Sequence, residues 1–337
     1  MTVVLDEAAT RASLPWEPLI EGVAEFFRKG CEMPLRHHHA FEVPGEGPGT
    51  LLLMPAWMPG KYLGLKMVTV IPGNSGRGLP TIAGSYLLSS GRTGKVLAMM
   101  DGAELTSRRT AAVSALAAKF LARESAENLL VVGAGRLSLN LIQAHAAIRP
   151  ISGISVWARR PEQATAVAEK AGRMGFVANA IEDLEGAARA ADIVSCCTLS
   201  EAPLIHGVWL KKGTHLDLVG AFKPQMRESD DRAVQQASVF ADTRDGVMSE
   251  GGDILQPLRA DCIEPDHLLG DLTDLCRGTH VGRRSDNEFT VFKSVGAALE
   301  DLAAACIAYE TFSSSRHANA PGDNTVESGT RESTFQR

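Results

Sequence analysis

A glycine-rich turn near the middle of the chain has the residue types and spacing of a phosphate-binding loop. It follows an apolar run at residues 129–132 and consists of Gly133, Ala134, Gly135, Arg136, Leu137 and Ser138. The first glycine permits a tight turn, the second lets a pyrophosphate approach the backbone, and the helix expected after the turn supplies free N–H groups. The pattern therefore predicts a dinucleotide-binding site, with a plain strand-to-helix turn as the alternative.

The end of the second strand of such a domain distinguishes NAD from NADP. A carboxylate there accepts the ribose 2′-hydroxyl of NAD, whereas arginine accommodates the 2′-phosphate of NADP. In this chain the corresponding residues are Ala158, Arg159 and Arg160, with no acid among them. Two guanidinium groups suit a phosphate dianion, so we predict that NADPH is preferred and that NADH is also used. Arginines on a solvated turn are the alternative.

Three cationic residues outside this region occur in unusual surroundings. Lys66 interrupts an apolar run at residues 63–70, Arg109 precedes an alanine-rich helix, and Arg36 precedes three histidines. Buried cations need a partner, and three that converge would hold a carboxylate; a surface position for each is the alternative. The three histidines do not predict a metal site, because neighbours on a strand face opposite sides and no second ligand cluster accompanies them.

The middle third of the chain must position the glycine-rich turn. Short apolar runs alternate there with segments of helical composition, such as residues 162–172 and 181–191. This alternation predicts βαβ units and a parallel sheet buried on both faces, a Rossmann-type doubly wound α/β domain. The six expected strands span residues 129–132, 154–157, 175–178, 193–198, 214–219 and 238–241.

The flanking regions have a different pattern. Residues 1–105 contain one amphipathic helix at 16–29, followed by candidate strands separated by Gly and Pro. Strands without regular helices predict a second domain of α+β type with an antiparallel or mixed sheet. A helix at 104–123 would carry the chain into the middle domain, and an alanine-rich helix at 292–309 would pack back across the boundary.

These patterns predict a division into domains. We assign residues 1–112 and 290–313 to a substrate and dimerisation domain and residues 113–289 to the Rossmann domain. Residues 314–337 are rich in Ser, Asn, Gly and Thr, and we expect them to form a disordered tail.

Composition excludes several classes of protein. The chain has 337 residues, 45% of them hydrophobic, and a net charge of −6, which does not favour nucleic acid as a partner. No charge-free stretch reaches the roughly 20 apolar residues of a membrane-spanning helix, and no secretory signal is visible. Six scattered cysteines fit neither a zinc site nor a disulfide framework. We therefore expect a cytoplasmic protein that does not engage membranes.

Several segments, taken together and in order, resemble the ornithine cyclodeaminase/mu-crystallin family. The resemblance extends from about residue 16 to residue 312. The matching segments are Lys66-Met67-Val68, Leu79-Pro80-Thr81, residues 105–112, the glycine-rich turn, Val219-Gly220-Ala221, Arg227-Glu228 and residues 292–301.

The resemblance implies a homodimer built through the non-Rossmann domain, with the substrate between the two domains. It implies that Arg36, Lys66 and Arg109 hold the substrate carboxylate, with Thr81 nearby. Four further residues are expected along the cofactor or near its nicotinamide ring: Thr198, Val219, Ser294 and Gly296.

One position departs from the family members that cyclise ornithine. Those members use an aspartate after the Gly-Ala turn to handle the side-chain amine, whereas this chain has Phe222 there and no acid until Glu228. A phenyl ring cannot bind an ammonium ion as a carboxylate does, but it packs against an apolar ring. The pocket therefore suits a substrate that is already cyclic, unless Phe222 is only core filler or the alignment is shifted at this turn.

The sequence from Gly220 to Asp230 resembles bacterial Δ1-pyrroline-2-carboxylate reductases. These enzymes also reduce Δ1-piperideine-2-carboxylate, and the products are L-proline and L-pipecolate, in the degradation of trans-3-hydroxy-L-proline. The resemblance implies that the bound carboxylate fixes C2 of the ring over the nicotinamide C4, with hydride transfer made effectively unimolecular. Lys66 or a bound water is the expected proton donor to the imine nitrogen.

Three alternatives stay open. Two are other enzymes of the family, ornithine cyclodeaminase, against which Phe222 argues, and an alanine-type dehydrogenase. The third is a binding protein without catalysis, since mu-crystallin-like members hold NADPH and a small ligand. Turnover of NADPH separates the enzymes from the binding protein.

Overall fold

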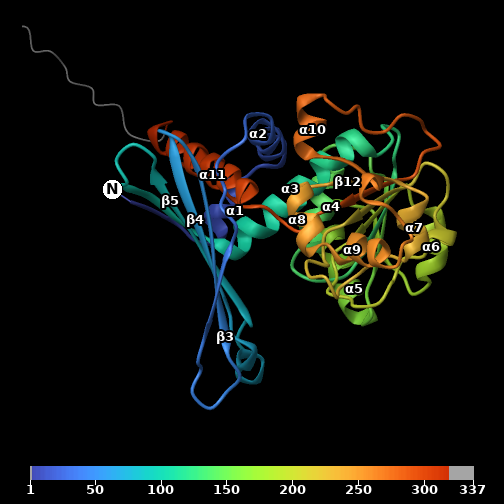
Figure 1. Ribbon diagram of the computed structural model, residues 1–337, viewed down its shortest axis with the longest axis horizontal. Coiled ribbons are helices and arrows are strands. Elements are labelled where there is room, and N and C mark those ends of the chain that lie inside the picture. Colours follow the sequence, from blue (N-terminus) through green and yellow to red (C-terminus); the bar gives the residue numbers. More distant parts are fainter. Residues whose placement is uncertain (1, 319–337) are drawn as a thin grey trace, which may run out of the picture.

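The apolar segments at the start of the chain pair into a six-stranded sheet in the order β1-β6-β5-β4-β3-β2. Neighbours are antiparallel, except that β1 lies parallel to β6. The computed structural model describes residues 2–318, and Figure 1 shows strand β3 and its neighbours reaching far beyond the helices. The strands are β1 (Val3–Leu5), β2 (His37–Phe41), β3 (Gly49–Met58), β4 (Tyr62–Val70), β5 (Ile82–Ser90) and β6 (Val96–Asp101).

Helices cover one face of this sheet (Figure 1). Helix α2 (Trp16–Lys29) has the bounds expected from the sequence and buries an apolar stripe that includes Leu19, Val23 and Phe27. Helix α11 (Ala298–Ala318) packs on α2 and on strands β3, β4 and β5. Helix α1 (Glu7–Ala12) packs against α3 (Gly102–Leu121).

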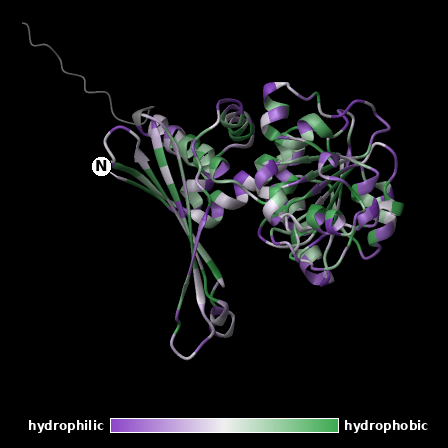
Figure 2. Ribbon diagram, in the orientation of Figure 1, coloured by the Kyte–Doolittle hydropathy of each residue, from purple (hydrophilic) through white to green (hydrophobic). Residues whose placement is uncertain are grey.

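The middle third of the chain forms a second sheet of eight strands, in which every neighbouring pair is parallel. The order is β13-β12-β14-β11-β10-β7-β8-β9. Figure 2 shows apolar strands at the centre and hydrophilic residues on the surrounding helices. The strands are β7 (Asn128–Val132), β8 (Gly153–Trp157), β9 (Ala178–Ala180), β10 (Ile193–Cys196), β11 (His215–Leu218), β12 (Ser238–Ala241), β13 (Leu268–Asp271) and β14 (Thr290–Lys293).

The connections between these strands are helical, which confirms the predicted Rossmann-type fold beside an α+β part. The α-helices are α4 (Ser138–Ala146), α5 (Pro161–Arg173), α6 (Leu184–Ala190), α7 (Asp231–Gln235), α8 (Arg244–Glu250), α9 (Gly252–Arg259) and α10 (Leu272–Arg277). Short 3-10 turns occur at η1 (Pro72–Arg77), η2 (Gly207–Trp209) and η3 (Pro265–His267).

Helix α3 joins the two sheets. It contacts β5 of the six-stranded sheet and α4, β11 and β14 of the parallel part. Its side chains are buried on all sides, among them Ala111, Ala112 and Ala115, and such small residues let neighbouring elements approach closely. Asp101 caps the N-terminus of the helix, because its side chain accepts a hydrogen bond from the N–H of Glu104 at 2.7 Å. This rigid connection fixes Arg109 between the two sheets.

Several expected boundaries are wrong. The parallel sheet has eight strands rather than six, and the helix expected at 292–309 begins only at Ala298, because buried Val291 and Phe292 belong to the central strand β14. The expected strand at 175–178 is instead β9, because residue 175 is a glycine with φ +93° that turns the chain after α5.

The expected division into domains stays a prediction, with two changes at its ends. Residues 290–293 lie inside the parallel sheet, so the second boundary falls after Lys293. Residues 314–318 continue helix α11, because the helix does not end where the composition becomes polar. The rest of the expected tail, 319–337, lies outside the described residues.

Candidate active site

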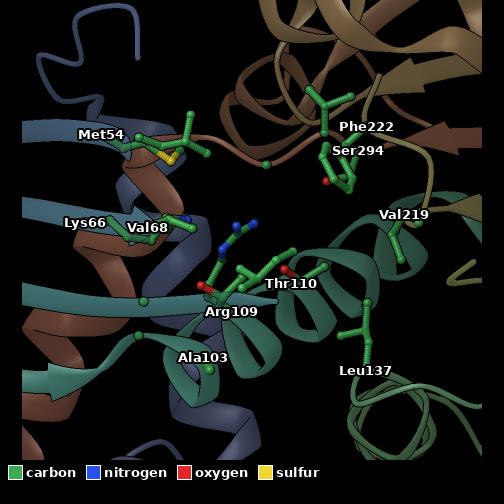
Figure 3. Close-up of a pocket in the computed structure, with 18 of the residues that line it drawn as sticks. Met54, Lys66, Val68, Ala103, Arg109, Thr110, Leu137, Val219, Phe222 and Ser294 are labelled. Atoms are coloured by element: carbon green, nitrogen blue, oxygen red, sulfur yellow. The ribbon is translucent and has the colours of Figure 1, made fainter. Parts of the chain in front are cut away.

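A cavity of about 370 Å³ lies between the two sheets. One wall comes from β3, β4 and β5 and from helix α3, and the other comes from loops at the carboxyl ends of β7, β10, β11 and β14. Ligands of open α/β sheets bind at this end of the strands. Figure 3 shows side chains from both walls turned toward the same space. Most of the lining is apolar: Leu52, Met54, Val68, Val70, Ile82, Leu137, Leu199, Val219 and Phe222.

Two cations from distant segments meet in the wall of this cavity. Lys66 pairs with Met54 in the sheet register and shares the cavity face of β4 with Val68, because alternate strand residues face the same side. Its Nζ lies 2.6 Å from Oδ2 of Asp301 on α11. The Nε of Arg109 lies 2.8 Å from the other oxygen of Asp301. Asp301 therefore bridges the two cations and fixes both.

Burial changes the acid–base properties of this group. Lys66 is only 3% exposed and Asp301 is fully buried. Burial lowers the pKa of Lys66 to about 8, although Asp301 partly counters the effect. Burial also opposes ionisation of Asp301, but Arg109 and Lys66 outweigh it and hold the pKa of this carboxyl below its usual range. Lys66 thus gives up a proton more readily than an exposed lysine does.

Arg36 reaches the same cavity from the loop before β2. Its Nη2 donates a hydrogen bond to the carbonyl of Gly296 at 2.9 Å and lies 3.4 Å from Oε2 of Glu250 on α8. The three cations expected to converge therefore do line one cavity. Arg36 is less buried than Arg109, with 22% of its side chain exposed.

The glycine-rich turn has the backbone geometry of a phosphate-binding loop. Gly133 has φ +120°, and a Cβ there would come within 2.9 Å of the Cys197 sulfur. A Cβ on Gly135 would meet nothing within 4 Å, so the backbone is open to a ligand at this point. The Oγ of Ser138 donates to the carbonyl of Gly135 at 2.7 Å, and Leu137 reaches the cavity.

A buried carboxylate organises the loop after β14. One oxygen of Asp242 accepts hydrogen bonds from Ser294 Oγ at 2.9 Å, from the N–H of Val295 at 2.8 Å and from the N–H of Gly296 at 2.7 Å. Gly296 has φ +82°, and a Cβ there would approach Arg109 to 2.8 Å. The loop therefore needs glycine both for its backbone and for the space that the guanidinium occupies.

A second buried carboxylate, Glu228, ties together the loops after β10 and β11. It accepts from the N–H and the hydroxyl of Thr198 at 2.6 and 2.8 Å, and from the N–H groups of Gly220 and Ala221 at 2.9 and 3.2 Å. Burial raises its pKa to about 7. The sequence did not predict that Asp242 and Glu228 anchor loops. Glu228 belongs to one of the segments that resemble the family, and Asp242 is an acid directly after an apolar strand, but neither signal indicates which N–H groups the carboxylate accepts from.

Comparisons with known proteins agree on one family. The sequence profile of the ornithine cyclodeaminase/mu-crystallin family matches residues 9–316. The chain belongs to this family. It is 41% identical to the Δ1-pyrroline-2-carboxylate reductase of Paracoccus denitrificans, over 86% of this chain and 90% of that protein. The resemblance inferred from the motifs is thereby confirmed.

Solved structures of this family have the same fold. The Δ1-pyrroline-2-carboxylate reductase of Thermococcus litoralis, in complex with NADH and L-proline, has a TM-score of 0.86 at 30% identity, covering 94% of this chain and 98% of that one. An archaeal alanine dehydrogenase dimer with bound NAD has a TM-score of 0.85 at 29% identity, covering 94% and 97%. Both similarities extend across the two sheets rather than over the Rossmann part alone.

The family resemblance implied a set of site residues, and the structure brings most of them together. Two exceptions are Thr81, which precedes β5 and leaves the cavity face to Ile82, and Thr198, whose hydroxyl is turned to Glu228. Their roles, like those of the other residues, stay predictions. The residues implied by the resemblance that do line the cavity are Arg36, Lys66, Arg109, Val219, Ser294 and Gly296, and Leu137 and Phe222, expected on other grounds, line it too. The other residues expected to bind the cofactor are not part of this lining: Gly133, Ala134, Gly135, Arg136, Ser138, Ala158, Arg159 and Arg160.

Phe222 lies on the cavity wall opposite the cations (Figure 3). The nearest acid after it, Glu228, is directed at the N–H groups of Gly220 and Ala221 and does not line the cavity. Within the described residues the turn thus presents an aromatic ring where ornithine-cyclising family members have an acid. Glu228 does not replace that acid.

The arginines expected near the cofactor differ in their surroundings. Ala158 is buried at the end of β8, whereas Arg159 and Arg160 are exposed and form no ion pair with any described residue. Arg136, in the glycine-rich turn, instead lies 3.4 Å from each of two carboxylates, those of Glu7 and Glu104. Arg159 and Arg160 are therefore free to meet an anion, while Arg136 already has partners.

The described part of the chain shows neither a metal-binding cluster nor a membrane-spanning helix. No cluster of three or more His, Cys, Asp or Glu side chains in residues 2–318 has the arrangement to hold a metal ion. Over the same residues, no helix combines the length and apolar character that crossing a membrane requires.

Proposed function

We propose that this protein is an NAD(P)H-dependent ketimine reductase that converts Δ1-pyrroline-2-carboxylate to L-proline and Δ1-piperideine-2-carboxylate to L-pipecolate. The observation that carries the proposal is a cavity with Lys66 and Arg109 on one wall and the ring of Phe222 on the other. Such a site matches a small ring that carries a carboxylate. The reaction belongs to the cytoplasmic degradation of trans-3-hydroxy-L-proline.

The cationic wall binds the substrate carboxylate. Asp301 holds Arg109 and Lys66, so the positions of both cations are set before the substrate arrives. Arg36 completes the site from the loop before β2, where it donates a hydrogen bond to the carbonyl of Gly296. Preorganised cations lose little side-chain entropy on binding. With its carboxylate held in this way, the ring turns its C=N bond toward the loops after β11 and β14.

The parallel-sheet wall fits a nicotinamide dinucleotide. The open backbone at Gly135 and the N-terminus of α4 suit a pyrophosphate, and Ser294 and Gly296 would lie beside the nicotinamide. When bound, the cofactor supplies the hydride. Arg159 and Arg160 have exposed guanidiniums without ion-pair partners among the described residues, which supports a preference for NADPH, with NADH also accepted.

The imine nitrogen needs a proton, because an iminium accepts hydride far better than a neutral imine. We assign this proton to the ammonium group of Lys66, or to a water beside it. The pKa of Lys66, lowered to about 8, leaves the group protonated at neutral pH but able to donate. Hydride added to C2 and the proton on nitrogen together give the secondary amine of the product.

A homodimer is part of the proposal. The face of the six-stranded sheet opposite Lys66 exposes a row of apolar side chains, including Leu63 and Met67 on β4 and Met99 on β6, which are 43–46% exposed. Helices α2 and α11 cover the other face, so this one is free to meet a second copy. The related archaeal alanine dehydrogenase was solved as a dimer. Light scattering on the purified protein should give twice the mass of the chain.

The test of function is NADPH oxidation at 340 nm with each cyclic imine, in parallel with L-ornithine plus NAD and pyruvate plus ammonia. We expect rapid oxidation with the imines alone, and faster turnover with NADPH than with NADH. Proline formed from ornithine would identify a cyclodeaminase, and consumption of pyruvate an alanine-type dehydrogenase. Cofactor binding without turnover of any of these compounds would leave a binding protein and overturn the proposal.

A further inference from the structure

The wall proposed to bind the substrate carboxylate contains two buried acids, Glu300 and Asp301, beside its two buried cations, Lys66 and Arg109. Oε2 of Glu300 lies 2.5 Å from Nη1 of Arg109, while Asp301 already bridges Arg109 and Lys66. All four side chains are at least nine-tenths buried. If both acids were ionised, two positive and two negative charges would cancel. The wall would then present no net charge to an anionic substrate.

Arg36 does not make up the difference. Its guanidinium lies 3.4 Å from Oε2 of Glu250, so its charge is also partly balanced. A substrate carboxylate that enters a buried, electrically neutral wall loses its hydration without an equivalent gain. One of the buried acids must therefore be neutral when the substrate binds.

The surroundings single out Glu300 rather than Asp301. Oδ1 of Asp301 accepts a hydrogen bond from Nε of Arg109, and Oδ2, which has no hydrogen bond, is paired with Nζ of Lys66 at 2.6 Å; Oε1 of Glu300 is buried with neither a hydrogen bond nor an ion pair among the described residues. Glu300 also faces two further carboxylates, Asp301 on its own helix and Asp242 at the end of β12. An unpartnered oxygen and two negative neighbours both disfavour the charged form.

We propose that Glu300 is a positioning residue that stays protonated beside Arg109, so that Lys66, Arg109 and Asp301 together keep one positive charge for the substrate carboxylate. This inference rests on the proposed function, because it concerns the binding of that carboxylate. Glu300 does not line the cavity and acts only through Arg109.

The electrostatics of the groups around Glu300 agree with this assignment. They are Arg109 from α3, Lys66 from β4, Asp301 from α11 and Asp242 after β12. Burial raises the pKa of Glu300 to about 8, although Arg109 opposes the rise. The carboxyl is therefore neutral at pH 7 and becomes charged as the pH rises through 8. Substrate binding should weaken over that range, with ionisation of Glu300 alone raising KM about tenfold for each pH unit above its midpoint.

Lys66 has a pKa near the same value. The fall of 1/KM at alkaline pH, the alkaline limb of the profile, therefore does not by itself show whether Glu300 or Lys66 loses the proton. Glu300→Gln separates them, because glutamine keeps the acceptor for Arg109 and imitates the protonated acid permanently. In the wild type both groups lose a proton along this limb, so 1/KM falls about a hundredfold per pH unit above both midpoints, whereas in the variant only Lys66 titrates and 1/KM falls about tenfold. If Glu300 is already ionised at neutral pH, glutamine instead adds net positive charge to the wall, KM at pH 7 falls clearly below the wild-type value, and the proposal is wrong.

A matched control exists on the same helix. Glu310 is exposed, accepts a hydrogen bond from the hydroxyl of Tyr62 at 2.9 Å and does not line the cavity, so Glu310→Gln makes the same chemical change outside the site. This variant should reproduce the wild-type pH profile. A wild type that neither turns over cyclic imines nor binds L-proline would refute the proposed function itself. A shift caused equally by both substitutions would refute the role of Glu300.

An infrared titration of the wild type gives a decision that does not depend on the folding of any variant. A protonated carboxyl has a C=O stretch that an ionised one lacks. Two buried carboxyl groups should lose this band as the pH rises, Glu228 near pH 7 and Glu300 near pH 8. Two steps support the proposal. A single step at about pH 7 or below would mean that Glu300 is ionised at neutral pH and would overturn it.

Discussion

The two walls of the cavity present different groups to a ligand. The parallel-sheet wall presents mainly backbone, with Gly135 open to a ligand and with loops that the buried carboxylates of Asp242 and Glu228 hold in place. The opposite wall works through side-chain charge, with Lys66 and Arg109 bridged by Asp301. A backbone site is local in sequence, whereas a charge cluster is assembled from segments far apart.

Removing Arg109 should have the largest effect, because the charge wall depends on it. Arg109→Ala deletes the proposed contact with the substrate, leaves buried Glu300 without its cation and leaves Asp301 with Lys66 alone. We expect KM for the cyclic imine to rise strongly and kcat/KM to fall by about 10³, with the protein destabilised by about 3–5 kcal/mol. Steady-state kinetics and chemical denaturation measure the two effects.

Arg108→Ala is the matched control for that experiment. Arg108 is equally buried, but it donates to the carbonyl of Leu14 and lies 3.9 Å from the ring centroid of Trp16, away from the cavity. Its loss should lower stability while KM changes little. If Arg109→Ala left both KM and kcat/KM unchanged, the charge wall would not be the substrate site.

A substitution at Gly135 tests the backbone wall. Because a Cβ there meets nothing within 4 Å, Gly135→Val should fold normally and fill the space expected for the pyrophosphate. We expect the dissociation constant of NADPH to rise about 100-fold, a change of about 2.7 kcal/mol. Gly172→Val adds the same group in open space on α5 and should bind NADPH normally. Equal affinities for the two variants would exclude the turn as a cofactor site.

Phe222 lies on the parallel-sheet wall, opposite the cations, and its replacement should have a smaller effect. Phe222→Asp puts a negative charge beside an anionic substrate and removes the apolar surface that the ring packs against. KM for Δ1-pyrroline-2-carboxylate should rise about tenfold. Phe222→Leu keeps an apolar side chain and should stay within a factor of three of the wild type. If the Phe222→Asp variant bound the cyclic imine as tightly as the wild type, the ring of the substrate would not lie against residue 222.

The contrast between the walls also explains what the sequence could predict. The glycine-rich turn and its fold were predictable, because backbone conformation leaves consecutive residues as a signature. Lys66 was conspicuous as a charge in an apolar strand, but its partner Asp301 is on the last helix, and nothing local indicates that pairing. The last two residues of strand β14 were assigned to the following helix, because a strand of four residues with only Val291 and Phe292 apolar is too short to show a period that separates strand from helix.

The smallest expected effect concerns Arg159 and Arg160, which bring charged side chains to the backbone wall. Both are exposed, so water and salt weaken whatever they bind, and each should contribute only about 0.7 kcal/mol to holding a 2′-phosphate. Replacing both with alanine should raise KM for NADPH about tenfold and change KM for NADH less than twofold. Arg173→Ala, at the far end of α5, removes an exposed charge without approaching that site and should change neither value. In the wild type, raising the salt concentration should reduce the difference between KM for NADPH and KM for NADH, because salt screens exposed charges. An equal loss for both cofactors would mean that the arginines support the loop rather than read the phosphate.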